Sequence, residues 1–188
     1  MGKRTDFEKN ARDYYFTPLE PIKSLVPYIS GQTYAEPCVG GGDLVYGINY
    51  FTFRTVNKPR CLWASDIEPD FIRLKTKTPD LQVCQLEASS LLPLHLVGID
   101  LIITNPPFTW SVLSRLLPVW INLKPTWLLL PSDMSNNVRF SQFMLYCSDI
   151  IPVGRVSWME NGQSGMENYS WYMFDAAWNK GYSRQYAR

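Results

Sequence analysis

The stretch Asp100–Phe108 constrains the fold most, because four apolar or β-branched residues run directly into Asn105, two prolines and an aromatic residue. This pattern predicts a buried strand that ends in an irregular loop. Pro107 excludes the helical region for Pro106, and both rings fix their own φ. Because neither proline has an N–H, the loop presents acceptors, namely the Asn105 side-chain oxygen and backbone carbonyls, beside the ring of Phe108. Such a loop suits a planar group that carries an amine.

A plainer interpretation of the same residues stays open at this point. The Pro-Pro pair could simply end the strand, with Phe108 returning to the core, since short motif matches carry a real false-positive risk. The rest of the chain has to decide between the two.

Length and composition predict one folded domain. The chain has 188 residues, of which 46% are hydrophobic and 19% charged, and its formal net charge is +1. These values are typical of a globular protein and exclude overall basicity as a sign of a nucleic-acid partner. We expect a loosely docked N-terminal arm over residues 1–13 and a single domain over residues 14–188, without a separate target-recognition domain.

The cysteines and the single histidine argue against a metal site. Cys38, Cys61, Cys84 and Cys147 form no C-x-x-C pair, and His95 stands alone. A zinc site is therefore not expected, and a reducing compartment is the simpler assumption. The polar N-terminus lacks an apolar signal core, and no run approaches the length of a membrane span. We expect a soluble, cytoplasmic protein with no membrane association.

A glycine-rich turn follows the first predicted strand. Tyr34–Leu44 predicts a short strand, a turn through Gly40, Gly41 and Gly42, and the start of a helix. Glycines let a backbone approach a ligand closely, and a helix start offers free N–H groups. The turn lacks the P-loop Gly-Lys-Ser/Thr and the full G-x-G-x-x-G, so phosphate binding is not the first interpretation, and a plain tight turn remains the alternative.

An acidic residue ends the second predicted strand. Cys61–Ser65 is that strand, and Asp66 follows it directly. An acid about 20 residues after a glycine-rich turn is where nucleotide-binding folds hold ribose hydroxyls. Asp66 is thus the candidate ribose ligand, although an acid at this place often only caps a helix.

The order of predicted elements indicates an α/β fold. Thr17 and Pro18 are placed to begin a helix that continues to Ile29. Strands alternate with helices until two final strands are joined only by a loop, which predicts a mostly parallel sheet with helices on both faces and a terminal antiparallel pair. The remaining predicted strands are 81–86, 101–104, 126–131, 150–159 and 169–178, and the remaining helices are 111–123 and 138–146.

Several motifs, in this order, resemble the S-adenosylmethionine-dependent adenine-N6 DNA methyltransferases, in particular the small single-domain enzymes of phages and restriction-modification systems. Asn105-Pro106-Pro107-Phe108 is similar to the catalytic tetrapeptide of that family, its most specific element. The resemblance covers nearly all of the chain from Tyr14 to Trp178 and implies a Rossmann-like class I methyltransferase fold with a seven-stranded sheet.

The resemblance also implies which residues bind the cofactor, S-adenosylmethionine. Asp66 corresponds to the ribose-binding acid, and Glu87 falls where an Asp more commonly contacts the adenine. The motif around Cys38, where the family more often has Phe, is similar to the cofactor turn. The implied cofactor-binding residues, which include the segment beside the methionine end, are Phe16, Thr17, Pro18, Glu36, Pro37, Gly40, Gly42, Asp66, Glu87 and Asn105.

The resemblance implies a mechanism that depends on acceptors. The exocyclic amine of adenine is a poor nucleophile, and Asn105 Oδ1 and the Pro106 carbonyl are expected to accept its two N–H bonds and position it for direct methyl transfer. The base must leave the duplex, and Phe108 is expected to stack on it. No metal and no covalent enzyme intermediate are needed, and Cys38 and His95 are expected to be structural.

Substrate and specificity are left open by these motifs. DNA is the expected partner, with relaxed or very short sequence specificity read by loops 132–139 and 160–168 or by basic residues near the ends (Lys3, Arg4, Lys180, Arg184, Arg188). A homodimer or a partner subunit that supplies specificity is an alternative. RNA methyltransferases acting on adenine-N6 or guanine-N2, and protein-glutamine methyltransferases, share the tetrapeptide chemistry, although the early Phe-Thr-Pro segment favours DNA. A binder without turnover is the alternative of a different class.

Overall fold

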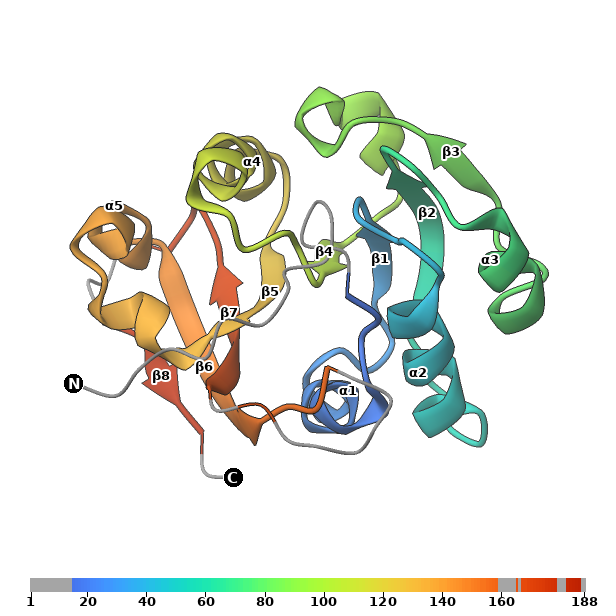
Figure 1. The fold of residues 1–188 in the computed structure, drawn as a ribbon, viewed down its shortest axis with the longest axis horizontal. Helices are drawn as coiled ribbons and strands as arrows, with labels where there is room; N and C mark the ends of the chain where they lie inside the picture. Colours follow the sequence, from blue (N-terminus) through green and yellow to red (C-terminus); the bar gives the residue numbers. More distant parts are fainter. Residues whose placement is uncertain (1–14, 159–164, 166, 179–181, 187–188) are drawn as a thin grey trace.

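A computed structural model describes residues 15–158, 165, 167–178 and 182–186. The predicted N-terminal arm and most of the predicted loop 160–168 lie outside these residues. Within the described part of the chain, one sheet runs through the molecule, and helices flank it on either side (Figure 1).

The sheet has the strand order β3-β2-β1-β4-β5-β7-β6-β8. The pairs among β3, β2, β1, β4 and β5 are all parallel, whereas β7 pairs antiparallel with both β5 and β6. The predicted parallel sheet with a terminal antiparallel pair is therefore confirmed. The strands are β1 Thr33–Glu36, β2 Arg60–Asp66, β3 Val83–Gln85, β4 Leu101–Thr104, β5 Thr126–Pro131, β6 Cys147–Arg155, β7 Asn168–Phe174 and β8 Arg184–Gln185.

The predicted count of seven strands is wrong, because the described residues include an eighth. β8 runs parallel to β6, with Asp149 opposite Arg184. A strand of two exposed residues carries no alternation of apolar and polar side chains, so no periodic signal marks it in the sequence.

The two faces of the sheet build two separate cores. In β4, Leu101 and Ile103 face one core, and Ile102 faces the other, as the two-residue period of a strand requires. α1, α2 and α3 cover the first face, and α4 and α5 cover the second (Figure 1). The α-helices are α1 Leu19–Leu25, α2 Asp43–Thr52, α3 Phe71–Lys77, α4 Trp110–Leu123 and α5 Ser141–Met144, and the 3-10 helices are η2 Val26–Tyr28, η3 Ala88–Ser90, η4 Pro93–Leu96, η5 Ser132–Asn136 and η6 Val138–Phe140.

Two predicted helices differ in detail from those observed. α1 begins after Pro18, which is its N-cap residue and makes no side-chain capping bond, so Thr17 is not the cap. The segment 138–146 forms a 3-10 turn and then the single α-helical turn of α5, not one helix. There the Asn137 side chain accepts a hydrogen bond from the Arg139 N–H, a local alternative to helix propagation.

A charged cluster attaches the C-terminal strand to the sheet. Asp149 is 5% exposed and accepts hydrogen bonds from Arg184 Nη2 at 2.9 Å and Tyr186 Oη at 2.8 Å. Burial raises the pKa of Asp149, but the hydrogen bonds from Arg184, Ser148 and Tyr186 outweigh it, so the net pKa is lowered. The ionised carboxylate therefore stabilises the folded chain.

We expect Asp149→Asn to lower the free energy of unfolding at neutral pH by about 2 kcal/mol, since it removes a charged acceptor from two donors. Because the folded pKa is lowered, this stabilisation is present above the unfolded pKa of about 4 and is lost as the pH falls through the folded value. Urea denaturation from pH 7 to pH 3 measures both effects. The exposed Asp80→Asn is the matched control, and equal pH dependence in Asp149→Asn and the unmodified chain would contradict this assignment.

Among the described residues, no helix combines the length and apolar character needed to cross a bilayer.

Candidate active site

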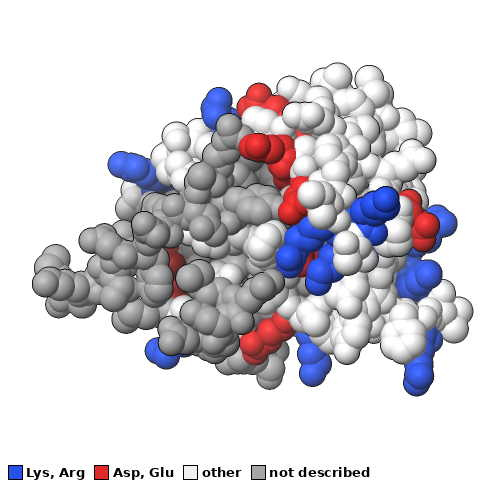
Figure 2. Space-filling view, turned by 45° about the vertical axis from the view of Figure 1, so that its right-hand side comes forward, with Lys and Arg blue, Asp and Glu red and all other residues white. Residues whose placement is uncertain are grey.

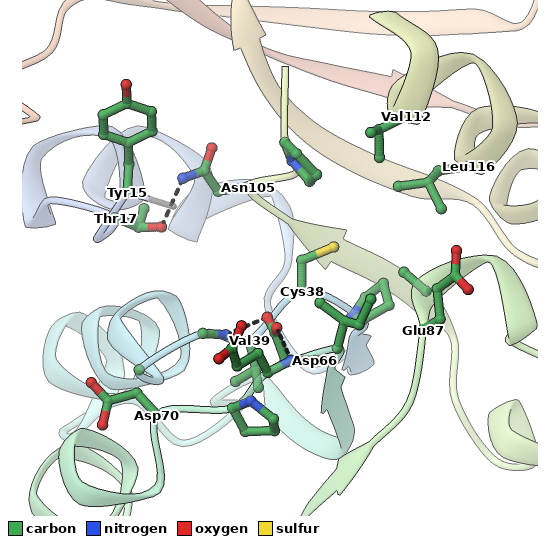
Figure 3. Close-up of a pocket in the computed structure, with 18 of the residues that line it drawn as sticks. Tyr15, Thr17, Cys38, Val39, Asp66, Asp70, Glu87, Asn105, Val112 and Leu116 are labelled. Carbon is green, nitrogen blue, oxygen red and sulfur yellow. Dashed lines mark hydrogen bonds between the residues drawn. The ribbon is translucent and has the colours of Figure 1, made fainter. Parts of the chain in front are cut away.

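The carboxyl ends of three neighbouring strands meet at one cavity. The glycine turn follows β1, Asp66 ends β2, and Asn105 follows β4. Ligands of open α/β sheets bind at this edge of the strands. The cavity has a volume of about 930 Å³, and the residues predicted from sequence that line it are Phe16, Thr17, Pro37, Gly40, Asp66, Glu87, Asn105 and Pro107 (Figure 3).

The other predicted site residues lie close by without lining this cavity. Glu36 is 1% exposed at the end of β1, and Gly42 and Pro106 are buried. Pro18 lines a second, smaller cavity of about 310 Å³. Phe108 is partly buried and packs against both cores. The alternative prediction, that this ring returns to the core, is therefore correct in part.

Asp66 fixes the glycine turn through its carboxylate. Its Oδ2 accepts a hydrogen bond from the Gly40 N–H at 2.9 Å, and its Oδ1 accepts one from the Glu68 N–H at 2.9 Å. Gly40 and Gly42 have φ values of 50° and 82°, which side-chain-bearing residues rarely adopt. A Cβ at Gly42 would also lie 2.9 Å from Leu74 Cδ2. The turn is therefore held in one conformation, open towards the cavity.

Asn105 presents an acceptor that has no partner. Its Nδ2 donates to Thr17 Oγ1 at 3.2 Å (Figure 3), whereas its Oδ1 is buried and makes no hydrogen bond within the structure. A buried acceptor without a partner costs about 1–3 kcal/mol of stability. Asn105 also lines the cavity, so its Oδ1 is available to a donor on a bound ligand. Thr17, which does not cap α1, thus orients the Asn105 amide.

Aromatic rings pack around Phe108, the last residue of the Asn-Pro-Pro-Phe tetrapeptide. Phe108 lies 6.0 Å from Trp158 and 5.7 Å from Tyr169 between ring centroids, and Tyr15 lies 6.0 Å from Trp158. Tyr15 also lines the cavity, next to Asn105 (Figure 3). Tyr15 and Trp158 were not predicted as site residues. The run of aromatic residues before Thr17 is a signal for the first, but only the folded chain brings Trp158 here.

Burial raises the pKa of two ionisable groups at the cavity, Glu36 and Cys38. Burial, together with the charges of Asp66 and Asp43, raises the pKa of Glu36 well above its usual value. Burial also raises the pKa of Cys38, with a further contribution from the charge of Asp66. The Cys38 thiol faces the cavity (Figure 3), but it is protonated and is a poor nucleophile at neutral pH.

His95 does not line the cavity. The His95 ring stacks on Trp63 at 5.4 Å, and its Nδ1 accepts a hydrogen bond from the Leu92 N–H at 3.1 Å. Within the part of the chain that the structure describes, no three His, Cys, Asp or Glu side chains are grouped as a metal site would require.

Comparison with known proteins identifies the fold and leaves the family open. No protein-family model and no curated protein matches the sequence. A solved structure of a proposed RNA methyltransferase from Pyrococcus horikoshii is similar over 90% of this chain and 91% of its own, with a TM-score of 0.63 and 13% identity.

Two further solved structures are longer than this chain. A modification subunit of a proposed type I restriction enzyme from Vibrio vulnificus is similar over 90% of this chain but only 45% of its own, with a TM-score of 0.57 and 13% identity. A proposed class I S-adenosylmethionine-dependent methyltransferase from Listeria monocytogenes is similar over 90% of this chain and 63% of its own, with a TM-score of 0.57 and 12% identity. The chain therefore has the fold that these methyltransferases share.

Proposed function

We propose that this protein transfers a methyl group from S-adenosylmethionine to the exocyclic N6 amine of adenine in DNA. The unpartnered, buried Asn105 Oδ1 carries this proposal, because it is an acceptor for which the described residues supply no donor. The two prolines after it leave backbone carbonyls and no N–H groups at the same place. An amine with two N–H bonds is the complementary group.

The residues of the chain act on the amine by positioning and by electrostatics. Asn105 Oδ1 and the Pro106 carbonyl accept its N–H bonds, which turns its lone pair towards the cavity. The Thr17 hydroxyl keeps the Asn105 amide in the orientation that exposes Oδ1. Phe108, with Trp158 and Tyr15 beside it, offers ring surface for a base extruded from a duplex.

The cavity fits the cofactor in size and in donor set. Its volume of about 930 Å³ lies within the range of small-molecule sites. In this proposal Asp66 binds the ribose hydroxyls, Glu87 the adenine, the glycine turn approaches the cofactor with its backbone, and Phe16 and Thr17 contact the methionine end. All of these residues line the cavity. S-adenosylmethionine, when bound, supplies an activated methyl group, so this assignment needs no metal.

DNA is chosen because the sequence motifs resemble those of adenine-N6 DNA methyltransferases and because the modification subunit from Vibrio vulnificus has a similar fold. By analogy with that subunit, we propose that a partner subunit could supply sequence specificity. RNA is the second candidate substrate, favoured by the Pyrococcus protein, whose length this chain almost matches. On the face shown in Figure 2, acidic and basic side chains lie next to one another, so attraction for a phosphate backbone would be local there. We propose that this chain, acting alone, recognises only a short or relaxed DNA sequence.

Methyl-labelled S-adenosylmethionine with purified protein tests the proposal. Duplex DNA, single-stranded DNA, RNA and a protein extract are offered separately, followed by digestion and nucleoside analysis. We expect label in N6-methyladenine from DNA, spread over many sequence contexts. Label only in RNA would move the assignment to the second candidate, and label only in protein would overturn both. Cofactor binding without label in any substrate would identify a binder or a missing partner subunit.

A further inference from the structure

Arg73 on α3 contacts two segments that build the cavity. Its Nε and Nη2 donate to Asp43 Oδ2 at 2.8 Å and Asp43 Oδ1 at 2.7 Å, a two-point pair with the first residue of α2. Its guanidinium carbon lies 3.6 Å from the centroid of the Phe16 ring. Arg73 thus joins α3, the start of α2 and the N-terminal segment that contains Phe16 and Thr17.

The glycine turn makes room for this arginine. A Cβ at Gly41 would lie 2.4 Å from Arg73 Cδ and 2.9 Å from Arg73 Cγ. The stem of Arg73 therefore runs directly over the turn, and the side chain is only 24% exposed. Asp43 is 10% exposed, so solvent screens the pair less than a surface ion pair.

The segment that Arg73 holds is the one that orients Asn105. Phe16 lies between the two cavities and lines both. The next residue, Thr17, accepts the hydrogen bond from Asn105 Nδ2 (Figure 3). Displacement of Phe16 would move Thr17 and release the Asn105 amide. The contact between Arg73 on α3 and Phe16 therefore affects the orientation of Asn105, which follows β4.

Lys77 cannot replace Arg73 in this arrangement. Its Nζ lies 3.7 Å from Asp43 Oδ1 and 4.5 Å from the centroid of the Tyr46 ring, not over Phe16. A lysine ammonium also lacks the planar fork that pairs with a carboxylate at two points while stacking on a ring. The geometry at Phe16 therefore depends on an arginine.

We infer that Arg73 is a positioning residue, which holds Phe16 and Thr17 in the wall of the cavity so that the Asn105 amide is oriented. The inference rests on the proposed function for its catalytic consequence, but its structural part stands on the contacts alone. Arg73 lines the smaller cavity and not the larger one that Asn105 lines.

The test compares Arg73→Ala, Arg73→Lys and Phe16→Leu with Lys75→Ala, an exposed basic residue of the same helix. Hydrogen exchange of the peptide that contains Phe16 and Thr17 is measured first. We expect faster exchange in Arg73→Ala and in Phe16→Leu, an intermediate rate in Arg73→Lys, and no change in Lys75→Ala. Thermal unfolding identifies a variant that has lost its fold, and Phe16→Leu and Arg73→Lys keep the test decisive in that event.

Binding of S-adenosylhomocysteine and steady-state kinetics give the second readout. Loss of the stacked, two-point contact should weaken binding roughly tenfold in Arg73→Ala. Phe16→Leu in the Arg73→Ala background should add little, because the two residues act as a unit. Unchanged exchange in a folded Arg73→Ala would overturn the inference. An unmodified chain that binds no cofactor would instead overturn the proposed function, while the exchange result would still decide the role of Arg73.

Discussion

Asn105→Ala should reduce methyl transfer by about 10²–10³-fold or more, because it deletes one preorganised acceptor for the reacting amine. Cofactor affinity should fall less than the rate of methyl transfer, because Asn105 is one of several residues expected to bind the cofactor and the glycine turn and Asp66 remain. The alanine also removes the hydrogen bond to Thr17 and the unpartnered Oδ1, so stability should stay the same or rise slightly. Single-turnover assays with saturating cofactor measure the chemical step separately from binding.

Asn105→Asp is the informative companion to this variant. An aspartate keeps an acceptor oxygen towards the cavity, and its second oxygen can accept a hydrogen bond from the Thr17 hydroxyl. It should therefore retain far more activity than the alanine. Asn49→Ala, on an exposed position of α2, is the control for an asparagine outside the cavity. A folded Asn105→Ala that transfers methyl at the rate of the unmodified chain would refute the mechanism.

Local patterns in the sequence were sufficient to predict the strand and the glycine turn that carry the site residues. The run Leu101–Thr104 predicted a buried strand, and its four residues are buried in β4. The consecutive glycines predicted a turn, and two of them have the positive φ that only glycine adopts readily. Strong β-branched runs and glycines act over a few residues, so one sequence is enough to find them.

Contacts between distant segments could not be predicted in this way. Thr17 looked like a helix cap, because a hydroxyl before Pro18 fits that role locally, yet it accepts its hydrogen bond from Asn105, 88 positions away. Arg73 carries no motif, and Trp158 was predicted only as part of the strand 150–159. Their roles depend on where α3 and the end of β6 lie after folding, which local propensity does not determine.

Glu36 and Asp66, the two acids of the site, differ in their burial and in their hydrogen bonds. Glu36 is buried and has an unpartnered Oε2, and it is surrounded by the charges of Asp66 and Asp43. Asp66 is only half-buried, and both of its oxygens accept backbone N–H bonds. Of the two, only Asp66 lines the cavity, so it is the stronger candidate for direct contact with a ligand.

Asp66→Ala should weaken cofactor binding by about 10–100-fold, which corresponds to the loss of one or two charge-assisted hydrogen bonds. The same change leaves the N–H groups of Gly40 and Glu68 without their acceptor, so the melting temperature should also fall. Calorimetric titration with S-adenosylhomocysteine, well below the unfolding transition, separates the effect on binding from the effect on stability.

Asp70→Asn is the matched control, because Asp70 lines the same cavity and its Oδ1 accepts the Arg73 N–H as the N-cap of α3. Asparagine caps a helix as well as aspartate does, so this variant removes a charge from the wall of the cavity without loss of the cap. If a negative charge anywhere in the cavity were enough, Asp70→Asn and Asp66→Asn would weaken binding equally. We expect only Asp66→Asn to do so, because an amide at Asp66 turns a donor towards the Gly40 or the Glu68 N–H and opens the turn that the carboxylate holds.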